Sequence, residues 1–324
     1  MSLSQTLTAT GETRPRVSAN PVGDRVLHAM TFASAVLVLI VLGGVFISLI
    51  QGSWLALSTF GFSFLTTQSW NPATEVFGAA APIYGTLVTS AIALLIAVPV
   101  GLGISIFLTE LCPAWLARPI AIAIELLAGI PSIIYGIWGL FVLAPFLQRT
   151  FQPFMIKAFH DIPLLNKLFA GPPYGIGVFT AAIILAIMIL PFISSVTRDV
   201  FETVPAVLKE AAYGLGCTTW EVVRRVVIPH TRAGVIGAIM LALGRALGET
   251  MAVTFVIGNA HRIAASILAP GTTISATIAN EFTEATGDLY TSSLIALGLI
   301  LFIVTFIVLA AARFMLHRME RQGK

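Results

Sequence analysis

Residues 210–229 read EAAYGLGCTTWEVVRRVVIP, a polar and helix-forming segment that lies between two apolar stretches of the chain. The flanking stretches cover about 175–196 and 234–258, and each is long enough to cross a bilayer, which takes roughly 20 apolar residues. A connection between two membrane spans needs no helices of its own. The helix-forming sequence therefore indicates that another protein docks on this segment.

The composition places the whole chain in a membrane. The sequence has 324 residues, of which 57% are hydrophobic and only 10% are charged, and its mean hydropathy is +0.95. A soluble domain carries about 25% charged residues. The basic residues form no stripe with interleaved aromatics, so the sequence predicts no nucleic-acid partner. The five histidines and two cysteines have no metal-ligand spacing, so no metal site is expected either.

Six segments qualify as spanning helices, and the predicted fold is therefore an all-α integral membrane protein. They cover about 29–50, 84–108, 119–147, 175–196, 234–258 and 292–313. The third is interrupted at 129–132, where Pro131 removes a backbone hydrogen bond and clashes with the preceding turn. We expect a break there, with Ser132 capping the second half. Broken helices are tolerated where they face protein or a water-filled cavity.

The charge distribution predicts that both chain ends are cytoplasmic. With six spans in that orientation, thirteen Lys and Arg residues lie inside and only Arg149, Lys157, Lys167 and Arg262 lie outside, in agreement with the positive-inside rule. The domain prediction that follows divides the chain into four parts. These are a cytoplasmic tail at 1–25, a first helix and periplasmic loop at 26–83, a transmembrane core at 84–313 with a cytoplasmic loop at 197–233, and a cytoplasmic tail at 314–324.

The cytoplasmic loop is predicted to contain two short helices. Thr203 and Pro205 suit the start of the first, and Gly214 and Gly216 suit its end. The second opens with Thr218-x-x-Glu221, a capping box, and Pro229 is expected to stop it.

The apolar residues of the loop recur at helical spacing. One predicted face contains Val204, Leu208, Ala211, Ala212 and Leu215, and the other contains Trp220, Val223 and Val227. A connecting loop with incidental helices is the simpler interpretation. The sharper one is a rigid lever whose apolar surface fits a cleft on a soluble partner.

The spacing Glu-Ala-Ala-x3-Gly-x9-Val-x-Ile-Pro from Glu210 to Pro229 resembles the EAA loop of type I ABC importer permeases, which have the MetI-like fold. In that family the loop docks on the ATP-hydrolysing subunit. The resemblance implies such a contact for Glu210, Ala211, Ala212, Gly216, Trp220 and Pro229. The chain has no GxxxxGK[ST] motif, so we expect no cofactor of its own and ATP bound by a partner ATPase.

The fifth predicted span carries two charged residues, Arg245 and Glu249, which are four apart and would share one helix face. A central Arg costs roughly 2.5–3.5 kcal/mol on an insertion scale, so such residues usually face an interior or a water path. One interpretation is a structural ion pair. The functional one is that Arg245 presents its planar donor fork to an oxyanion while Glu249 compensates its charge when the path is empty. Glu125, in the third span, is ranked below this pair as a structural carboxylate.

Three runs extend the resemblance to the PstC-type permeases of bacterial high-affinity phosphate importers. They are 244–259, which reads GRALGETMAVTFVIGN, 125–136, and 214–221. The similarity covers the chain from about Asp24 onward. It implies inorganic phosphate as substrate and a role for Arg245 and Glu249 in transport. The implied partners are a PstA-like permease, a PstB-like ATPase dimer and a periplasmic PstS-like phosphate-binding protein, in the inner-membrane lipid bilayer.

Two other functions stay open. The EAA-like segment does not distinguish phosphate from sulfate, molybdate or phosphonate, and the chain could also report phosphate status to a signalling kinase. An intramembrane enzyme is not expected, because no Ser/His, paired Asp or HExxH constellation is present at workable spacing.

Overall fold

The computed structural model describes residues 21–322. The chain divides into two compact units, 1–48 and 49–324. Within the described residues, the first unit is the N-terminal part of helix α1 (Pro21–Phe60). Residues 1–20 of the predicted tail lie outside the described residues, and helix is already present from Pro21 onward.

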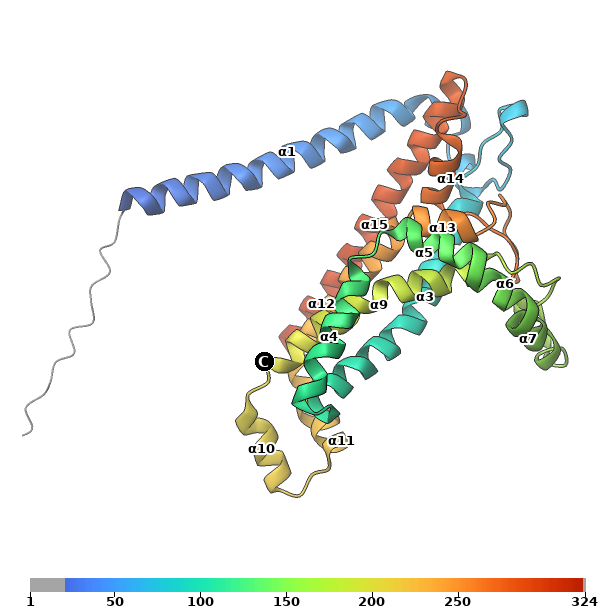
Figure 1. Cartoon of the computed structure of the whole chain (residues 1–324). Coiled ribbons are helices and arrows are strands. Elements are labelled where there is room, and N and C mark those ends of the chain that lie inside the picture. Colours follow the sequence, from blue (N-terminus) through green and yellow to red (C-terminus); the bar gives the residue numbers. More distant parts are fainter. Residues whose placement is uncertain (1–20, 323–324) are drawn as a thin grey trace, which may run out of the picture. The chain divides into compact units, whose positions relative to one another are not determined.

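The second unit is helical, and its elements are drawn in Figure 1. Its α-helices after α1 are α2 (Ser63–Thr66), α3 (Ala80–Ile106), α4 (Ala114–Ala128), α5 (Ser132–Trp138), α6 (Ala144–Phe146), α7 (Gln152–Ala158), α8 (Pro163–Leu168), α9 (Val178–Glu202), α10 (Ala206–Gly214), α11 (Thr219–Val222), α12 (Ile228–Gly248), α13 (Met251–Val256), α14 (Ile274–Glu281) and α15 (Asp288–Gln322). A 3-10 turn, η1 (Pro72–Thr74), and the wider π-type turns η2 (Phe107–Leu111), η3 (Gly139–Leu143), η4 (Leu147–Phe151) and η5 (Val223–Val227) interrupt or extend these helices.

Six helical runs within residues 21–322 are long and apolar enough to span a membrane, in agreement with the predicted number. They are Gly23–Phe60, Ala80–Leu111, Ser132–Ala158, Val178–Glu202, Thr219–Gly248 and Asp288–Phe314. The third and fifth runs begin at positions that differ from the prediction by more than ten residues, for reasons given below.

The core of the second unit is the pair of helices α3 and α9, which approach each other closely. Gly101 makes this possible, because a Cβ at that position would lie 2.7 Å from the side chain of Ile193. Beside it, the Ser105 hydroxyl donates hydrogen bonds to the carbonyls of Gly101 and Ser194, each at 2.9 Å. Small side chains such as Ala93 and Ala97 are fully buried along the same contact. Small residues that let helix backbones approach are typical of membrane helix interfaces.

The third span is broken where the sequence predicts a break. Helix α4 ends at Ala128, and α5 begins again at Ser132 after Pro131. The Tyr135 hydroxyl donates to the carbonyl of Leu127 at 2.8 Å, which satisfies a carbonyl that the break leaves without a helical partner. The predicted cap is wrong, since Ser132 is the first helical residue and Pro131 holds the cap position without a side-chain bond. The continuous span therefore starts at Ser132 instead of 119.

The fifth span is broken as well, which the sequence analysis missed. Helix α12 ends at Gly248, and α13 follows after two residues, so the predicted continuous helix over 234–258 is wrong. The helices that follow the two breaks pack on each other. Gly136 of α5 allows this approach, because a Cβ there would lie 2.8 Å from Phe255 and 3.1 Å from the Cα of Ala252, both on α13.

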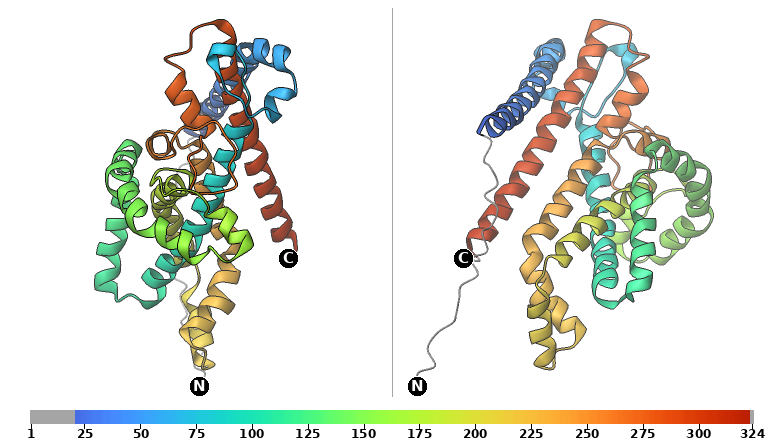
Figure 2. Two further views of the ribbon diagram at one scale, coloured as in Figure 1. Left: turned by 90° about the vertical axis from the view of Figure 1, so that its right-hand side faces the viewer. Right: turned by 60° about the vertical axis from the view of Figure 1, so that its left-hand side comes forward.

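One carboxylate connects three segments of the chain. Helix α14, which carries it, and the start of α15 lie at the end of the second unit away from α10 and α11 (Figure 2). Glu281, the last residue of α14, accepts hydrogen bonds from the Trp70 indole and, at 2.8 Å, from the Tyr290 hydroxyl. Its other oxygen lies 2.8 Å from Nε2 of His261. The rings of Trp70 and His261 stack with centroids 5.4 Å apart. Glu281 therefore joins the segment before α3, the loop after α13 and the start of α15.

This cluster predicts a pH-dependent stability. Burial alone would raise the pKa of the Glu281 carboxyl, but hydrogen bonds from His261 and Tyr290 outweigh it and hold the pKa below its usual range. Such a carboxyl stabilises the fold above its ordinary pKa, and this contribution is lost as the pH falls through the lower folded-state value. We expect Glu281→Gln to lower the melting temperature at neutral pH and to flatten its decline between about pH 6 and about pH 3.

The measurement is thermal unfolding of the purified protein in detergent at a series of pH values. The matched control is Glu284→Gln, which removes an exposed carboxyl three residues away. Equal pH profiles for Glu281→Gln and the unmodified chain would contradict the assignment.

Candidate functional site

The segment between α9 and α12 forms a rigid corner with well-defined ends. Helix α10 closes with a Schellman motif, in which the amides of Gly216 and Cys217 donate to the carbonyls of Tyr213 and Ala212. Gly216 adopts a φ of +83°, the left-handed conformation that this motif requires. The predicted capping box of α11 is present, with the Thr218 and Glu221 side chains each accepting from the other's backbone amide. The predicted cap at Thr203 is wrong, because its hydroxyl donates to Val200 at the end of α9.

The residues matched to the EAA motif lie on the surface of this corner. Glu210, Ala211, Gly216, Trp220 and Pro229 are exposed, and Ala212 is half-buried. The most exposed apolar side chains are Leu215 at 87%, Val207 at 72% and Trp220 at 64%.

The two predicted apolar faces are each divided between surface and interior. Val204 and Val223 are buried in the protein's own core, together with Val227, whereas Leu208 and Trp220 point outward. The interior side fixes the corner to the bundle, and the outer side remains an apolar surface.

Pro229 does not stop the helix, contrary to the prediction. The helical run continues from Thr219 to Gly248, and the wide turn η5 ends two residues before Pro229. A Pro inside a helix removes one donor and clashes with the carbonyl four residues earlier, and a π-type turn accommodates this by changing the local hydrogen-bond pattern. The second half of the corner, from Thr219 onward, and the helix that carries Arg245 therefore form one continuous helical run.

Arg245 lies in the last turn of α12, where a positive charge complements the carbonyl end of the helix. Its guanidinium carbon lies 4.4 Å from the ring centroid of Phe192 on α9, a cation–π contact. Among residues 21–322, Arg245 has no carboxylate within ion-pair distance. The Arg245 donors are thus held in place by an aromatic face and not by a counter-ion.

Glu249 does not share a helix face with Arg245, which corrects the prediction. Its backbone is extended at the break after α12, with φ −68° and ψ 130°. Its Oε1 accepts from the amide of Ala252 at 3.3 Å and so caps the first turn of α13. The i, i+4 spacing fails here because the helix ends before the second residue is reached.

A groove of about 720 Å³ runs along α12 and α15 beside Arg245. Its polar lining groups are the guanidinium groups of Arg245 and Arg313 and the hydroxyl of Thr305, and none of the described lining residues carries a carboxylate. The rest of the lining is Phe192, Gly237, Met240, Leu241, Gly244 and Leu309. A Cβ at Gly244 would lie 3.7 Å from the Leu309 side chain of α15, whereas a Cβ at Gly248 would meet nothing within 4 Å.

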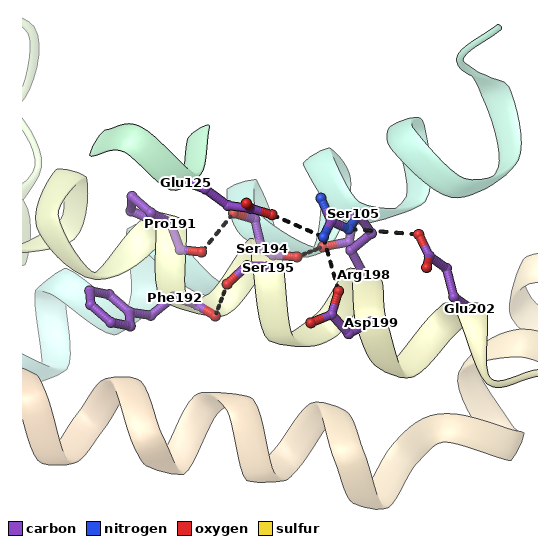
Figure 3. A network of polar contacts seen from close by, with 9 residues as sticks. All are labelled: Ser105, Glu125, Pro191, Phe192, Ser194, Ser195, Arg198, Asp199 and Glu202. Carbon is purple, nitrogen blue, oxygen red and sulfur yellow. Dashed lines mark hydrogen bonds and ion pairs between the residues drawn. The ribbon is translucent and has the colours of Figure 1, made fainter. Parts of the chain in front are cut away.

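Glu125 belongs to a different arrangement, shown in Figure 3. Arg198 of α9 reaches Glu125 of α4 at 3.0 Å, Asp199 at 3.0 Å and Glu202 at 3.7 Å. The Glu125 side chain is half-exposed and paired with Arg198, so it is not a buried carboxylate. Three carboxylates around one guanidinium leave no positive charge for an anion. The two arginines therefore differ in charge compensation. Carboxylates neutralise Arg198, whereas no described carboxylate pairs with Arg245.

Comparison with known proteins decides the family. The family described as "Binding-protein-dependent transport system inner membrane component" matches residues 100–321. This chain belongs to it. The match includes the corner at α10–α11, both helix breaks and Arg245.

Curated relatives are similar over nearly their whole length. "Phosphate transport system permease protein PstC" of Mesorhizobium japonicum is 75% identical over 92% of this chain and 91% of its own. The protein of the same name from Pasteurella multocida is 58% identical over 89% and 90%. They agree with the predicted resemblance to PstC-type permeases.

Solved structures establish the fold of this permease as that of type I ABC importers. An alginate ABC transporter chain aligns with a TM-score of 0.59 over 91% of this chain and 96% of that one, at 18% identity. The same transporter in complex with its alginate-bound periplasmic protein gives a TM-score of 0.61.

The sequence singles out Arg245 as a charged residue in a predicted span, but it does not indicate which side chains surround it. Phe192 carries no signal in the sequence, since an aromatic residue in an apolar helix is ordinary. The pairing of Glu125 with Arg198 joins residues 73 positions apart, and nothing in the sequence spacing predicts it. The break after Gly248 could have been suspected from Gly244, Gly248 and the polar Glu249-Thr250 pair.

The two arginines are predicted to differ in their effect on stability. Arg198→Met removes the partner of Glu125, Asp199 and Glu202, and we expect a loss of about 1.5–3 kcal/mol, the usual worth of hydrogen bonds to a charged group. Arg245→Met removes no ion pair, and we expect a change within about 0.5 kcal/mol. Thermal and urea unfolding of both variants in one detergent measures the difference, and a larger loss for Arg245→Met would reverse the assignment.

Proposed function

We propose that this chain is one of two permease subunits of an ATP-driven importer of inorganic phosphate, and that it forms half of the translocation path. The observation that carries the proposal is Arg245, a guanidinium held over Phe192 in a groove whose described lining residues include no carboxylate. A planar donor fork of this kind matches the oxygens of phosphate. The names of the 75% and 58% identical relatives favour phosphate over sulfate, molybdate or phosphonate.

The affinity of such a site is expected to be modest. Of the two guanidinium groups in the groove, that of Arg245 is held over Phe192, and one such group neutralises only part of a phosphate dianion. A transport path has to release its cargo, so tight capture belongs to a separate periplasmic binding protein of the PstS type. The second half of the path belongs to a facing permease of the PstA type.

ATP hydrolysis is assigned to a separate pair of PstB-like subunits, since the chain carries no P-loop. The exposed apolar residues of the corner, above all Leu215, Val207 and Trp220, are suited to a cleft on such a subunit. Movement of the ATPase would reach Arg245 along the continuous run Thr219–Gly248. The corner therefore faces the cytoplasm in this proposal, with both chain ends on the same side.

Reversing the charge at the site should stop transport. We expect Arg245→Glu to reduce uptake of labelled phosphate by at least about 100-fold, because a carboxylate in place of the donor fork repels the anion, while assembly with the other subunits is retained. The measurement is uptake into proteoliposomes that contain the whole transporter. Arg198→Glu is unsuitable as a control because it breaks a structural network, so Arg262→Glu, an exposed arginine outside the groove, serves instead.

Competition by unlabelled oxyanions identifies the cargo in the same assay. Unlabelled phosphate should suppress uptake, whereas sulfate and molybdate at equal concentration should leave it within about twofold. Preferential inhibition by sulfate would overturn the choice of phosphate.

Unchanged uptake by Arg245→Glu would refute the assignment of Arg245 to the transport site. Variants of residues 210–229 that keep phosphate uptake but lose a phosphate-dependent signal to a kinase would favour the alternative function, in which the chain reports phosphate status.

The ATPase contact is tested by co-purification. We expect Trp220→Ala and Leu215→Ala together to reduce the amount of ATPase subunit that purifies with this chain by about tenfold or more, since buried aromatic and apolar anchors dominate interface energies. Trp54→Ala is the matched control, because Trp54 is 70% exposed, close to the 64% of Trp220, and lies outside the corner. An equal yield of ATPase for the double variant and the control would contradict the docking assignment.

A further inference from the structure

Helix α10 is joined along the chain to α9 through residues 203–205 and to α12 through α11 and η5, and it also has a side-chain connection to α3. Lys209 directly precedes the exposed Glu210 but points the other way. Its Nζ lies 2.5 Å from Oε1 of Glu110 in η2, the turn that ends the α3 span. The Glu110 side chain is only 6% exposed and that of Lys209 is 20% exposed. This is the most buried of the ion pairs among the described residues.

The direction of Lys209 follows from the helix. Ala212, three residues later, lies on the same face and packs against the buried cluster around Phe201, Val222 and Val227. The inward face of α10 thus has an apolar contact and a salt bridge side by side. Because Glu110 is buried, removing Lys209 would leave a carboxylate out of water with no opposite charge, which proteins seldom tolerate.

The helix at the other end of this ion pair is the central one. Helix α3 is locked to α9 by the close approach at Gly101 and by the bond from Ser105 to the carbonyl of Ser194. Two residues before Ser194, α9 carries Phe192, whose ring faces Arg245. A displacement of α10 would therefore reach the Arg245–Phe192 contact through the chain connections to α9 and α12. The Lys209–Glu110 pair would pass the same displacement to α3, which is locked to α9.

We propose that the Lys209–Glu110 ion pair is a positioning contact for transport, which makes α3 move together with α10 when the ATPase moves it. The inference rests on the proposed function, since it assumes that an ATPase docks on α10. Without the pair, α10 would still pull on α9 and α12, to which the chain joins it, but α3 would not follow. ATP would then be hydrolysed with little phosphate carried.

The test uses the four-component transporter in proteoliposomes, with phosphate uptake and ATP hydrolysis measured on the same sample. We expect Glu110→Gln and Lys209→Met each to lower phosphate carried per ATP hydrolysed by about tenfold while ATPase still co-purifies. Lys209→Arg, which keeps the charge, should stay within about twofold of the unmodified protein. The exchanged pair, Glu110→Lys with Lys209→Glu, should recover at least about a third of the ratio. A normal ratio in both single variants, or an exchanged pair no better than either single variant, would overturn the proposal.

Cross-linking covers the case in which the single variants fail to assemble. Cysteines at 110 and 209, in a background with Cys112 and Cys217 replaced by serine, are joined by a short flexible thiol cross-linker. We expect the double-cysteine transporter to carry little phosphate per ATP before cross-linking, because the ion pair is gone. Once the cross-link joins α3 to α10, it should recover at least half of the uptake of the unmodified protein. A normal ratio of phosphate to ATP before cross-linking, or no recovery of uptake after it, would refute the proposal.

The two proposals fail in different ways. If the unmodified transporter carries no phosphate, the proposed function is wrong. If it carries phosphate and the variants remain coupled, only the role of the ion pair is wrong.

Discussion

The requirement that backbone polar groups be satisfied inside a membrane governs this structure. Water is absent from the hydrocarbon region, so a break in a spanning helix must be covered by other parts of the protein. Residues 21–322 contain two such breaks, at 129–131 and at 249–250, and a different side chain covers each. The Tyr135 hydroxyl accounts for the carbonyl of Leu127 at the first, and the Glu249 carboxylate accounts for the amide of Ala252 at the second. The helices that follow, α5 and α13, then pack on each other through Gly136.

The same constraint explains why the charged residues are divided as they are. A charge in or near a membrane is costly unless it has a partner or faces water. Arg198 and Lys209 have carboxylates opposite them and hold helices together. Arg245 has only the face of Phe192 and the open groove beside α15. An uncompensated guanidinium is a poor structural element, and this makes it the better candidate for binding an anion that comes and goes.

Much of the fold could be predicted from local pattern. The number of spans follows from hydropathy, the break before Ser132 follows from Pro131, and the corner at Gly216 and Thr218 follows from turn and capping chemistry. The errors have physical causes too. Pro229 was expected to end a helix, but the π-type turn η5 accommodates the missing N–H of Pro229 and the helix continues. Glu249 was expected beside Arg245, but α12 ends one residue earlier. The apolar faces of the loop were read as uniform, yet Val204 and Val223 are buried on the protein itself while Leu208 and Trp220 are not.

The sequence by itself determined the class of protein, the six spans, the corner at 210–229 and Arg245 as a residue with an unusual charge for its surroundings. These properties depend on composition and on neighbours within a few positions along the chain. Only the tertiary structure decided which charges are neutralised, because the partners lie far away in sequence. Glu125 is 73 residues from Arg198, and Glu110 is 99 residues from Lys209. Ion pairing depends on distance in space, and that distance is fixed by helix packing rather than by the order of residues.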